Sequence, residues 1–209
     1  LSDAAMLHLS GYALLESPQR EALQRAVALA QAGGIPISLD TALDPALRCP
    51  DDMRRLLPGL TICALGLEEA AALLGSDNPD EAIERLLALR VKIAAIKLAG
   101  KGCLLASEAE KVRIPPFIVP SVDATGAGDA FCAGLIYGWL NGLSLSATGV
   151  LAGALGALAT TALGGGGSLH DINSLITFLA DQRATPAYSA YLAAFDELIQ
   201  TLQKTRPRT

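Results

Sequence analysis

The sequence predicts an α/β fold with a mostly parallel central sheet, and three observations indicate this class. Short apolar runs alternate with helix-length segments through the first two-thirds of the chain, which is typical of a parallel sheet covered by helices. The last third has a mainly helical pattern. Finally, 51% of the 209 residues are hydrophobic and 18% are charged, which indicates a globular protein with a sizeable core.

The predicted strands are short and mostly apolar. They cover residues 5–10, 35–40, 60–65, 92–99, 102–107 and 111–117. The turn Gly100-Lys101-Gly102 joins the fourth strand to the fifth, since glycine pairs of this kind mark tight turns.

Capping residues mark the helix boundaries. Ser17 is the predicted N-cap of the first helix, with Pro18 at its first helical position and Gly33 past its end, and Asn78 followed by Pro79 repeats the signature. Further helices are expected over 51–59, 67–75, 127–140, 145–163, about 171–182 and about 187–204. The four glycines at 164–167 are interpreted as a loop inside one domain that covers residues 1–209.

Charge and cysteine content exclude several classes of protein. The formal net charge is −5, and no block of Lys and Arg could follow a phosphate backbone, so nucleic-acid binding is not expected. The four cysteines contain no CxxC pair, which favours buried thiols in a reducing, cytoplasmic compartment. No signal peptide is expected. The chain starts at Leu1 rather than Met, which suggests that the numbering begins inside a longer polypeptide.

The segment 130–170 contains no Asp, Glu, Lys or Arg and is long enough to raise the question of a membrane span. It is rich in Gly, Ala, Ser and Thr, and it lacks the flanking basic residues and aromatic belt of such spans. Closely packed buried helices are therefore expected, and a membrane or interaction protein remains the alternative.

Residues 123–129 read Asp-Ala-Thr-Gly-Ala-Gly-Asp and precede an apolar helix. Backbone N–H groups at a glycine-rich helix start form an anion site, most often for phosphate. Gly126 and Gly128 permit a tight turn and close approach of a ligand, and Thr125 is a candidate cap. Asp129 suits a base that deprotonates a hydroxyl during phosphoryl transfer. The alternative is that Gly126, Ala127 and Gly128 only start a tightly packed helix, and that Asp129 interacts favourably with the positive end of the helix dipole.

The longer string VDATGAGDAFCAGL, residues 122–135, resembles the signature D-T-x-G-A-G-D-x-F of the PfkB (ribokinase-like) family of sugar and nucleoside kinases, and it departs at Ala124. The resemblance covers essentially the whole chain and corresponds to about the latter two-thirds of a family member. It implies a ribokinase-like α/β/α sandwich, without the small β lid that the family carries in its N-terminal portion. It also implies ATP, Mg²⁺ and a monovalent cation such as K⁺ as cofactors, and a homodimer formed through the lid.

Two further stretches carry the resemblance. IKLAGKGCLL, residues 96–105, is similar to the family's KxGxxG strand-turn-strand, with Ala99 at the first glycine position. GLEEAAALLG, residues 66–75, is similar to the N-x-x-E helix start, with Gly66 at the Asn position.

The resemblance implies roles for individual residues. Asp129 is the base, and the anion hole is formed by Gly126, Ala127 and Gly128. Glu69, expected at an exposed helix start, holds Mg²⁺ through water or is only a solvated acid. Asp123 binds the monovalent cation or only braces the turn.

Other residues are candidates for contacts with the nucleotide and with the acceptor. The nucleotide-site candidates are Lys97, Gly100, Gly102 and Thr125, although Lys97 could equally be a solvated lysine at a strand end. Asp40 and Arg48 are acceptor-side candidates, with a solvated turn as the alternative. His8 and His170 are not expected to be catalytic.

The sequence therefore predicts a PfkB-type kinase that transfers the γ-phosphoryl group of ATP to a hydroxyl of a sugar or sugar acid. The departure at Gly66 leans towards the 2-keto-3-deoxygluconate branch over ribokinase proper. The alternative is a non-catalytic relative that binds nucleotide or sugar as a sensor, which Ala124 and Gly66 favour.

Overall fold

The computed structural model describes residues 3–164 and 171–205, which divide into two compact units. Unit 1 comprises Leu1–Ala99 with Leu104–Lys111, and unit 2 comprises Gly100–Cys103 with Val112–Thr209. The described residues form a six-stranded sheet with its strands in sequence order, which confirms the predicted α/β class. Its strands are β1 (Leu7–Ser10), β2 (Ile37–Asp40), β3 (Ile62–Gly66), β4 (Ile93–Lys97), β5 (Cys103–Ala106) and β6 (Lys111–Ile114).

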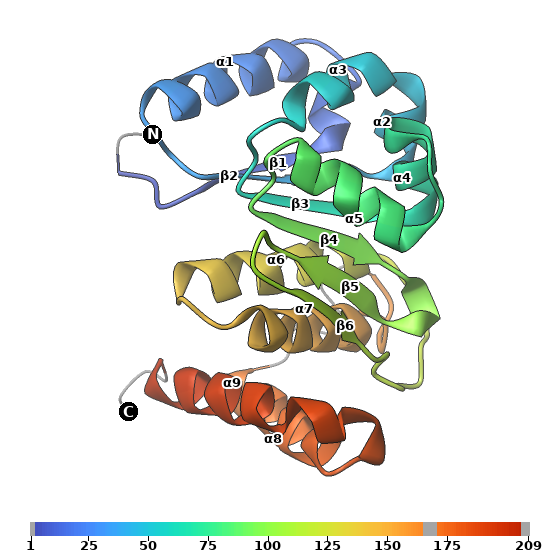
Figure 1. Cartoon of the computed structure of the whole chain (residues 1–209), viewed down its shortest axis with the longest axis vertical. Coiled ribbons are helices and arrows are strands. Elements are labelled where there is room, and N and C mark those ends of the chain that lie inside the picture. Colours follow the sequence, from blue (N-terminus) through green and yellow to red (C-terminus); the bar gives the residue numbers. More distant parts are fainter. Residues whose placement is uncertain (1–2, 165–170, 206–209) are drawn as a thin grey trace. The chain divides into compact units, whose positions relative to one another are not determined.

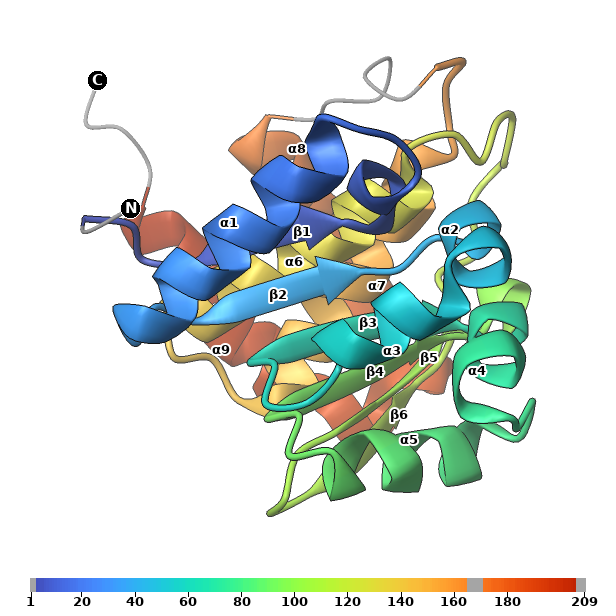
Figure 2. The same ribbon diagram turned by 90° about the horizontal axis from the view of Figure 1, so that it is seen from above.

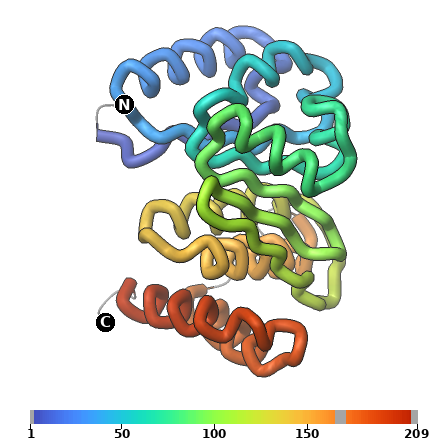
Figure 3. Tube along the Cα trace, in the orientation of Figure 1, coloured from blue at the N-terminus to red at the C-terminus, as the bar shows by residue number. Residues whose placement is uncertain are grey.

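Strands β1 to β4 of unit 1 are parallel neighbours. The register pairs Asp40 at the end of β2 with Ala64 of β3, and Gly66 at the end of β3 with Lys97 at the end of β4. The chain therefore leaves these three strands at the same end of the sheet. Figure 3 traces the path of the chain as a tube. In open α/β sheets, ligands bind outside this carboxyl edge.

Helices cover one face of β1–β4, as Figures 1 and 2 show for α1, α3 and α5. Alternate strand residues such as Cys63, Leu65 and Ile96 join the core of unit 1, because successive side chains of a strand point to opposite faces. The helical elements of this unit are η1 (Gly11–Leu14), α1 (Gln19–Ala32), α2 (Leu43–Arg48), α3 (Pro50–Leu56), α4 (Leu67–Leu74) and α5 (Pro79–Ala88), and η2 (Ala99–Lys101) follows β4.

The start of α1 differs from the prediction. The helix begins at Gln19, with Pro18 at the N-cap position and no side-chain cap. The hydroxyl of Ser17 donates to the carboxylate of Glu21 at 2.7 Å, so it does not bond the helix amides and the predicted Ser17 cap is wrong. The equivalent prediction at Asn78 is confirmed, because its side chain accepts hydrogen bonds from two amides of the first turn of α5.

Helix α2 was not predicted, because the segment 38–48 was interpreted as a strand end followed by a turn. Pro45 lies in the first turn of this helix, where its missing N–H is tolerated. Pro45 and Ala46 are buried, so packing stabilises a helix that the local sequence does not indicate.

The uncharged segment forms two helices of unit 2, α6 (Ala127–Leu140) and α7 (Leu145–Ala159), and α7 is shorter than predicted. A Cβ at Gly134 would lie 2.5 Å from Cα of Ala152, and one at Gly138 would lie 2.4 Å from Oγ1 of Thr148. The prediction of closely packed helices is confirmed. Within the described ranges, no helix is long and apolar enough to cross a membrane.

The remaining helices of unit 2 are α8 (Ile172–Arg183), η3 (Pro186–Tyr191) and α9 (Leu192–Lys204). They pack around an aromatic cluster in which the rings of Phe117 and Tyr188 stack at 4.8 Å and Tyr188 meets Phe195 edge-on at 5.3 Å. Of the four glycines predicted to form a loop at 164–167, only Gly164 belongs to the described residues, and His170 lies outside them.

Three of the cysteines, Cys63, Cys103 and Cys132, are buried, and Cys49 is partly buried. Burial raises the pKa of the Cys103 thiol to about 12. The pKa of Cys63 is also raised, first by burial and then by the nearby carboxylates of Asp40 and Glu69. Both thiols therefore stay protonated at neutral pH and are poor nucleophiles.

Candidate functional site

The structure brings four polar residues together at the carboxyl ends of the parallel strands of unit 1. Three of them, Asp40, Glu69 and Lys97, were singled out from the sequence, each in a different role. The fourth, Thr41, was not. We call Asp40, Thr41, Glu69 and Lys97 the strand-end cluster.

The ammonium of Lys97 lies between two carboxylates. Its Nζ donates to Oδ1 of Asp40 at 2.8 Å and lies 4.0 Å from Oε2 of Glu69. The side chains of Lys97, Asp40 and Glu69 are only 21%, 14% and 11% exposed, so solvent screens these charges less than in a surface ion pair. The predicted contact of Lys97 with nucleotide stays a prediction.

Glu69 is buried, with a relative exposure of 8%, so the expectation of an exposed helix start is wrong. The reason is that α4 begins directly where β3 ends, which turns the third helical residue back over the strand end. Oε2 of Glu69 accepts hydrogen bonds from Oγ1 of Thr41 at 2.5 Å and from N of Gly66 at 2.9 Å. Oε1 has no hydrogen-bond partner among the described residues.

Thr41 is fully buried and is held by tight backbone geometry on both sides. A Cβ at Gly11 would lie 2.0 Å from the carbonyl oxygen of Thr41, so only glycine fits there. The next residue, Ala42, has φ 56° and ψ 148°, a combination that is rare outside glycine. The available sequence signal was a polar residue directly after the acid that ends a buried strand.

Arg48 pairs with its own helix rather than with the strand-end cluster. Its guanidinium bonds Asp44 at 3.3 Å on the same helix, and the two side chains are 56% and 52% exposed. Such surface pairs contribute little to stability. Among the described residues, no hydrogen bond or ion pair therefore joins Arg48 to Asp40.

The second predicted constellation is residues 123–129 of unit 2, which we call the glycine loop. Gly126 is the N-cap of α6 with φ 80°, and as a glycine it makes no side-chain cap. The hydroxyl of Thr125 donates to Oδ1 of Asp123 at 2.8 Å, so the prediction that Thr125 caps the helix is wrong. The N–H of Ala127 donates to the carbonyl of Ala124 at 3.1 Å.

The first turn of α6 still presents donors and an acid. The amides of Gly128 and Asp129 are in the first helical turn, where no intrahelical acceptor exists. Asp129 is exposed, and its carboxylate has no hydrogen bond or ion pair among the described residues. A helix N-terminus of this kind attracts anions.

Asp123 braces the glycine loop. Its carboxylate accepts hydrogen bonds from N and Oγ1 of Thr125, and from N of Gly164 at 2.9 Å. The hydrogen bond from Gly164, followed by those from Thr125, lowers the pKa of Asp123 below its ordinary value. The carboxylate is therefore ionised at neutral pH, and the predicted cation contact stays a prediction.

The turn after Lys97 uses one glycine for packing and leaves the other open. Gly102 has φ 83°, and a Cβ there would lie 2.1 Å from the carbonyl oxygen of Ile114. Gly100 is exposed with nothing within 4 Å of an added Cβ. Ala99 has φ 50°, so it adopts a left-handed conformation at the position of the motif's first glycine.

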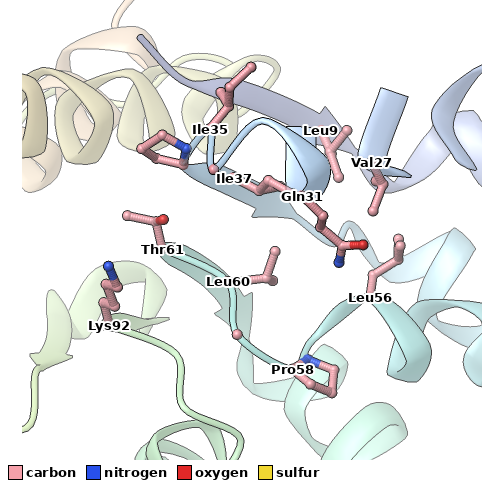
Figure 4. Close-up of a pocket in the computed structure, with 13 residues that line it drawn as sticks. Leu9, Val27, Gln31, Ile35, Ile37, Leu56, Pro58, Leu60, Thr61 and Lys92 are labelled. Atoms are coloured by element: carbon pink, nitrogen blue, oxygen red, sulfur yellow. The ribbon is translucent and has the colours of Figure 1, made fainter. Parts of the chain in front are cut away.

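The pocket in Figure 4 lies at the opposite edge of the sheet of unit 1. Its volume is about 260 Å³, and its walls include Ile37 at the start of β2, Thr61 directly before β3 and Lys92 directly before β4. These are the amino ends of the strands whose carboxyl ends carry the strand-end cluster. The pocket is therefore not part of that site.

Comparison with protein families places the chain clearly. Residues 1–172 match the model of the pfkB family carbohydrate kinases. An uncharacterised sugar kinase of Archaeoglobus fulgidus is 35% identical over 115 residues, which is 55% of this chain and 46% of that protein. A fructokinase of Klebsiella pneumoniae is 35% identical over 175 residues, which is 76% of this chain and 55% of that protein. The chain thus spans about half the length of these relatives.

Solved structures share the fold. A provisionally named ribokinase II of E. coli, solved without ligand and with ATP and Mg²⁺, superposes with a TM-score of 0.80 at 28% identity, over 87% of this chain and 60% of that chain. A double mutant of Vibrio cholerae fructokinase, solved with fructose, ADP and a potassium ion, has a TM-score of 0.72 at 25% identity, over 83% of this chain and 59% of that chain.

Proposed function

Since this chain belongs to the pfkB family of carbohydrate kinases, we propose that it is the nucleotide-binding body of an enzyme that phosphorylates a hydroxyl of a sugar or sugar acid from ATP. The observation that carries the proposal is the glycine loop at the start of α6. It combines first-turn amides that lack helical acceptors with an exposed acid, Asp129. A site for bound phosphate alone gains nothing from a neighbouring negative charge.

Asp129 is the proposed general base. A carboxylate within hydrogen-bond reach of the acceptor hydroxyl can take its proton as the oxygen attacks phosphorus. The loop of Gly126, Ala127 and Gly128, with the amides of the first turn of α6, stabilises the negative charge of the group being transferred. Because Gly126 and Gly128 have no Cβ, phosphate oxygens can approach the backbone closely.

The residues present fit Mg²⁺ held mainly by other ligands. The described residues contain no group of three or more His, Cys, Asp or Glu that could chelate a metal, and Mg²⁺ at nucleotide sites usually keeps waters and phosphate oxygens as ligands. Glu69 offers Oε1, which has no hydrogen-bond partner in the described part of the chain, while Oε2 is held by Thr41 and Gly66. When bound, Mg²⁺ would neutralise charge on the phosphates.

The remaining ligand contacts are proposed from the family pattern. Lys97, Gly100, Gly102 and Thr125 would line the nucleotide, and Asp123 would lie beside the monovalent cation. A relative binds ATP with Mg²⁺ and another binds ADP with potassium, which supports these cofactors here.

The acceptor side is proposed at Asp40, whose carboxylate ends β2 beside Lys97. Arg48 would take part only if the acceptor reaches the exposed end of α2. The acceptor class extends from fructose-like and ribose-like sugars to 2-keto-3-deoxygluconate. A homodimer through a lid and a cytoplasmic location are likewise proposed.

The proposal is tested with the full-length protein, ATP, Mg²⁺ and a panel of fructose, ribose, their phosphates, adenosine and 2-keto-3-deoxygluconate. We expect ADP release that depends on at least one of these acceptors, with the phosphorylated product identified by mass spectrometry. If nucleotide and sugar bind without any ADP release, the sensor function favoured by Ala124 and Gly66 replaces the kinase.

A further inference from the structure

We propose that Thr41 is a positioning residue that fixes which oxygen of Glu69 faces the metal site. This inference rests on the proposed metal role of Glu69. It concerns a residue directly after the neighbouring strand β2 that no sequence motif indicated.

The geometry of the hydroxyl carries the first step. Oγ1 of Thr41 lies 2.5 Å from Oε2 of Glu69 and 3.5 Å from the carbonyl oxygen of Ala64. A hydroxyl has one proton to donate, and the shorter distance is typical of a hydrogen bond to a carboxylate. The proton of Thr41 is therefore committed to Glu69.

The second step is the asymmetry of the carboxylate. Oε2 receives the hydroxyl of Thr41 and the amide of Gly66, and Nζ of Lys97 lies 4.0 Å away. The ammonium is too distant for a hydrogen bond, so it supplies charge without direction. Thr41 is thus the single side chain among the described residues that donates a hydrogen bond to Oε2, and Oε1 is left for a metal-bound water.

The third step is the rigidity of the donor. Thr41 is fully buried, its carbonyl packs against the space where Gly11 lacks a side chain, and Ala42 continues with φ 56°. These constraints hold the backbone of Thr41, so its hydroxyl has a fixed origin. Gly66 has no side chain that could take over this contact.

The experiment measures metal affinity without turnover. Mn²⁺ replaces Mg²⁺, ADP is held at saturation, and free Mn²⁺ is followed by its electron paramagnetic resonance signal in the full-length protein. Thr41→Val keeps the shape and removes the donor, whereas Thr41→Ser keeps the donor. We expect Val to weaken Mn²⁺ binding about 10-fold, at the low end of second-sphere effects, and Ser to remain within about 2-fold of wild type.

Controls separate this inference from the function on which it rests. Thr61→Val removes a buried hydroxyl at the opposite edge of the same sheet and should leave Mn²⁺ affinity unchanged. Glu69→Gln should weaken it. If Glu69→Gln weakens binding and Thr41→Val does not, the positioning role is overturned and the metal role stands. If neither variant changes Mn²⁺ affinity, both are overturned.

A second measurement distinguishes positioning from folding. Thermal melting of each variant is recorded, and if Thr41→Val does not fold, Thr41→Ala is compared with Thr41→Ser in its place. A positioning role predicts that Thr41→Val loses turnover mainly at low Mg²⁺, and that its turnover at saturating Mg²⁺ is closer to that of the wild type. An equal loss at all Mg²⁺ concentrations contradicts it.

Discussion

The strand-end cluster and the glycine loop hold their charged groups in opposite ways. In the cluster, side chains from β2, β4, α4 and the residue after β2 bond one another in a poorly exposed site, with Lys97 and Asp40 lying 57 residues apart in sequence. In the glycine loop, neighbours in sequence brace a turn, and backbone amides at a helix start supply the donors. The cluster therefore depends on the sheet register, whereas the loop depends on local conformation.

The largest expected effect is at Asp129 in the glycine loop. Asp129→Asn keeps the size of the side chain but cannot accept the proton, so kcat should fall by about 10²–10⁴. Nucleotide affinity should hold or improve, because a negative charge near the phosphates is removed. Steady-state kinetics and nucleotide titration measure the two quantities. Near-normal kcat would make Asp129 a simple helix-start acid, and joint loss of affinity and fold would make it structural.

The next effect tests whether the strand-end cluster acts as a unit. Lys97→Met and Asp40→Asn should each lower the free energy of unfolding by about 2 kcal/mol, because each leaves the other charge partly buried. The double variant should lose less than the sum, with a coupling of about 1 kcal/mol in urea unfolding. The exposed pair Asp44–Arg48 is the matched control, with a coupling below about 0.5 kcal/mol. Additive losses in the cluster would refute the pairing.

A smaller effect compares backbone conformation in the two regions. Gly126 in the glycine loop and Ala99 after the strand-end cluster both have positive φ, 80° and 50°. Gly126→Ala should destabilise by about 1 kcal/mol and Ala99→Gly should stabilise by about 0.5 kcal/mol, because a Cβ is disfavoured in this region. Chemical denaturation measures both. Gly100→Ala is the control, because nothing lies within 4 Å of an added Cβ there. A change in stability of the same sign for Gly126→Ala and Ala99→Gly would contradict the explanation.

The smallest effect is the pH dependence of the Asp123 brace. Hydrogen bonds from Gly164 and Thr125 lower the pKa of Asp123, so its stabilising contribution is present above the ordinary Asp pKa and is lost as the pH falls through the lowered value. Asp123→Asn should therefore be less stable than wild type near neutral pH. The difference should shrink in acid, as measured by denaturant unfolding across pH. A difference in stability that does not change with pH would contradict a stabilising role of the ionised Asp123 carboxylate.

Local patterns in the sequence were sufficient for much of the fold. The apolar runs locate the six strands to within a few residues, and the helix from residue 127 to residue 140 is found with its predicted bounds. Periodicity, turn glycines and the Asn78 cap act through neighbours along the chain, so they can be read without a structure. Helix α2 was missed because its stability comes from burial of Pro45 and Ala46.

By itself the sequence determined the α/β class, the family resemblance and the location of the glycine loop, because each depends on residues that are adjacent in the chain. Only the tertiary structure decided that Glu69 is buried and that Thr41 holds it. Those two residues lie 28 positions apart, and they meet only because β2 and β3 pair in one register and end at the same edge. The physical reason is that parallel pairing brings the carboxyl ends of the strands to the same side of the sheet, whatever the length of the helical connections between them.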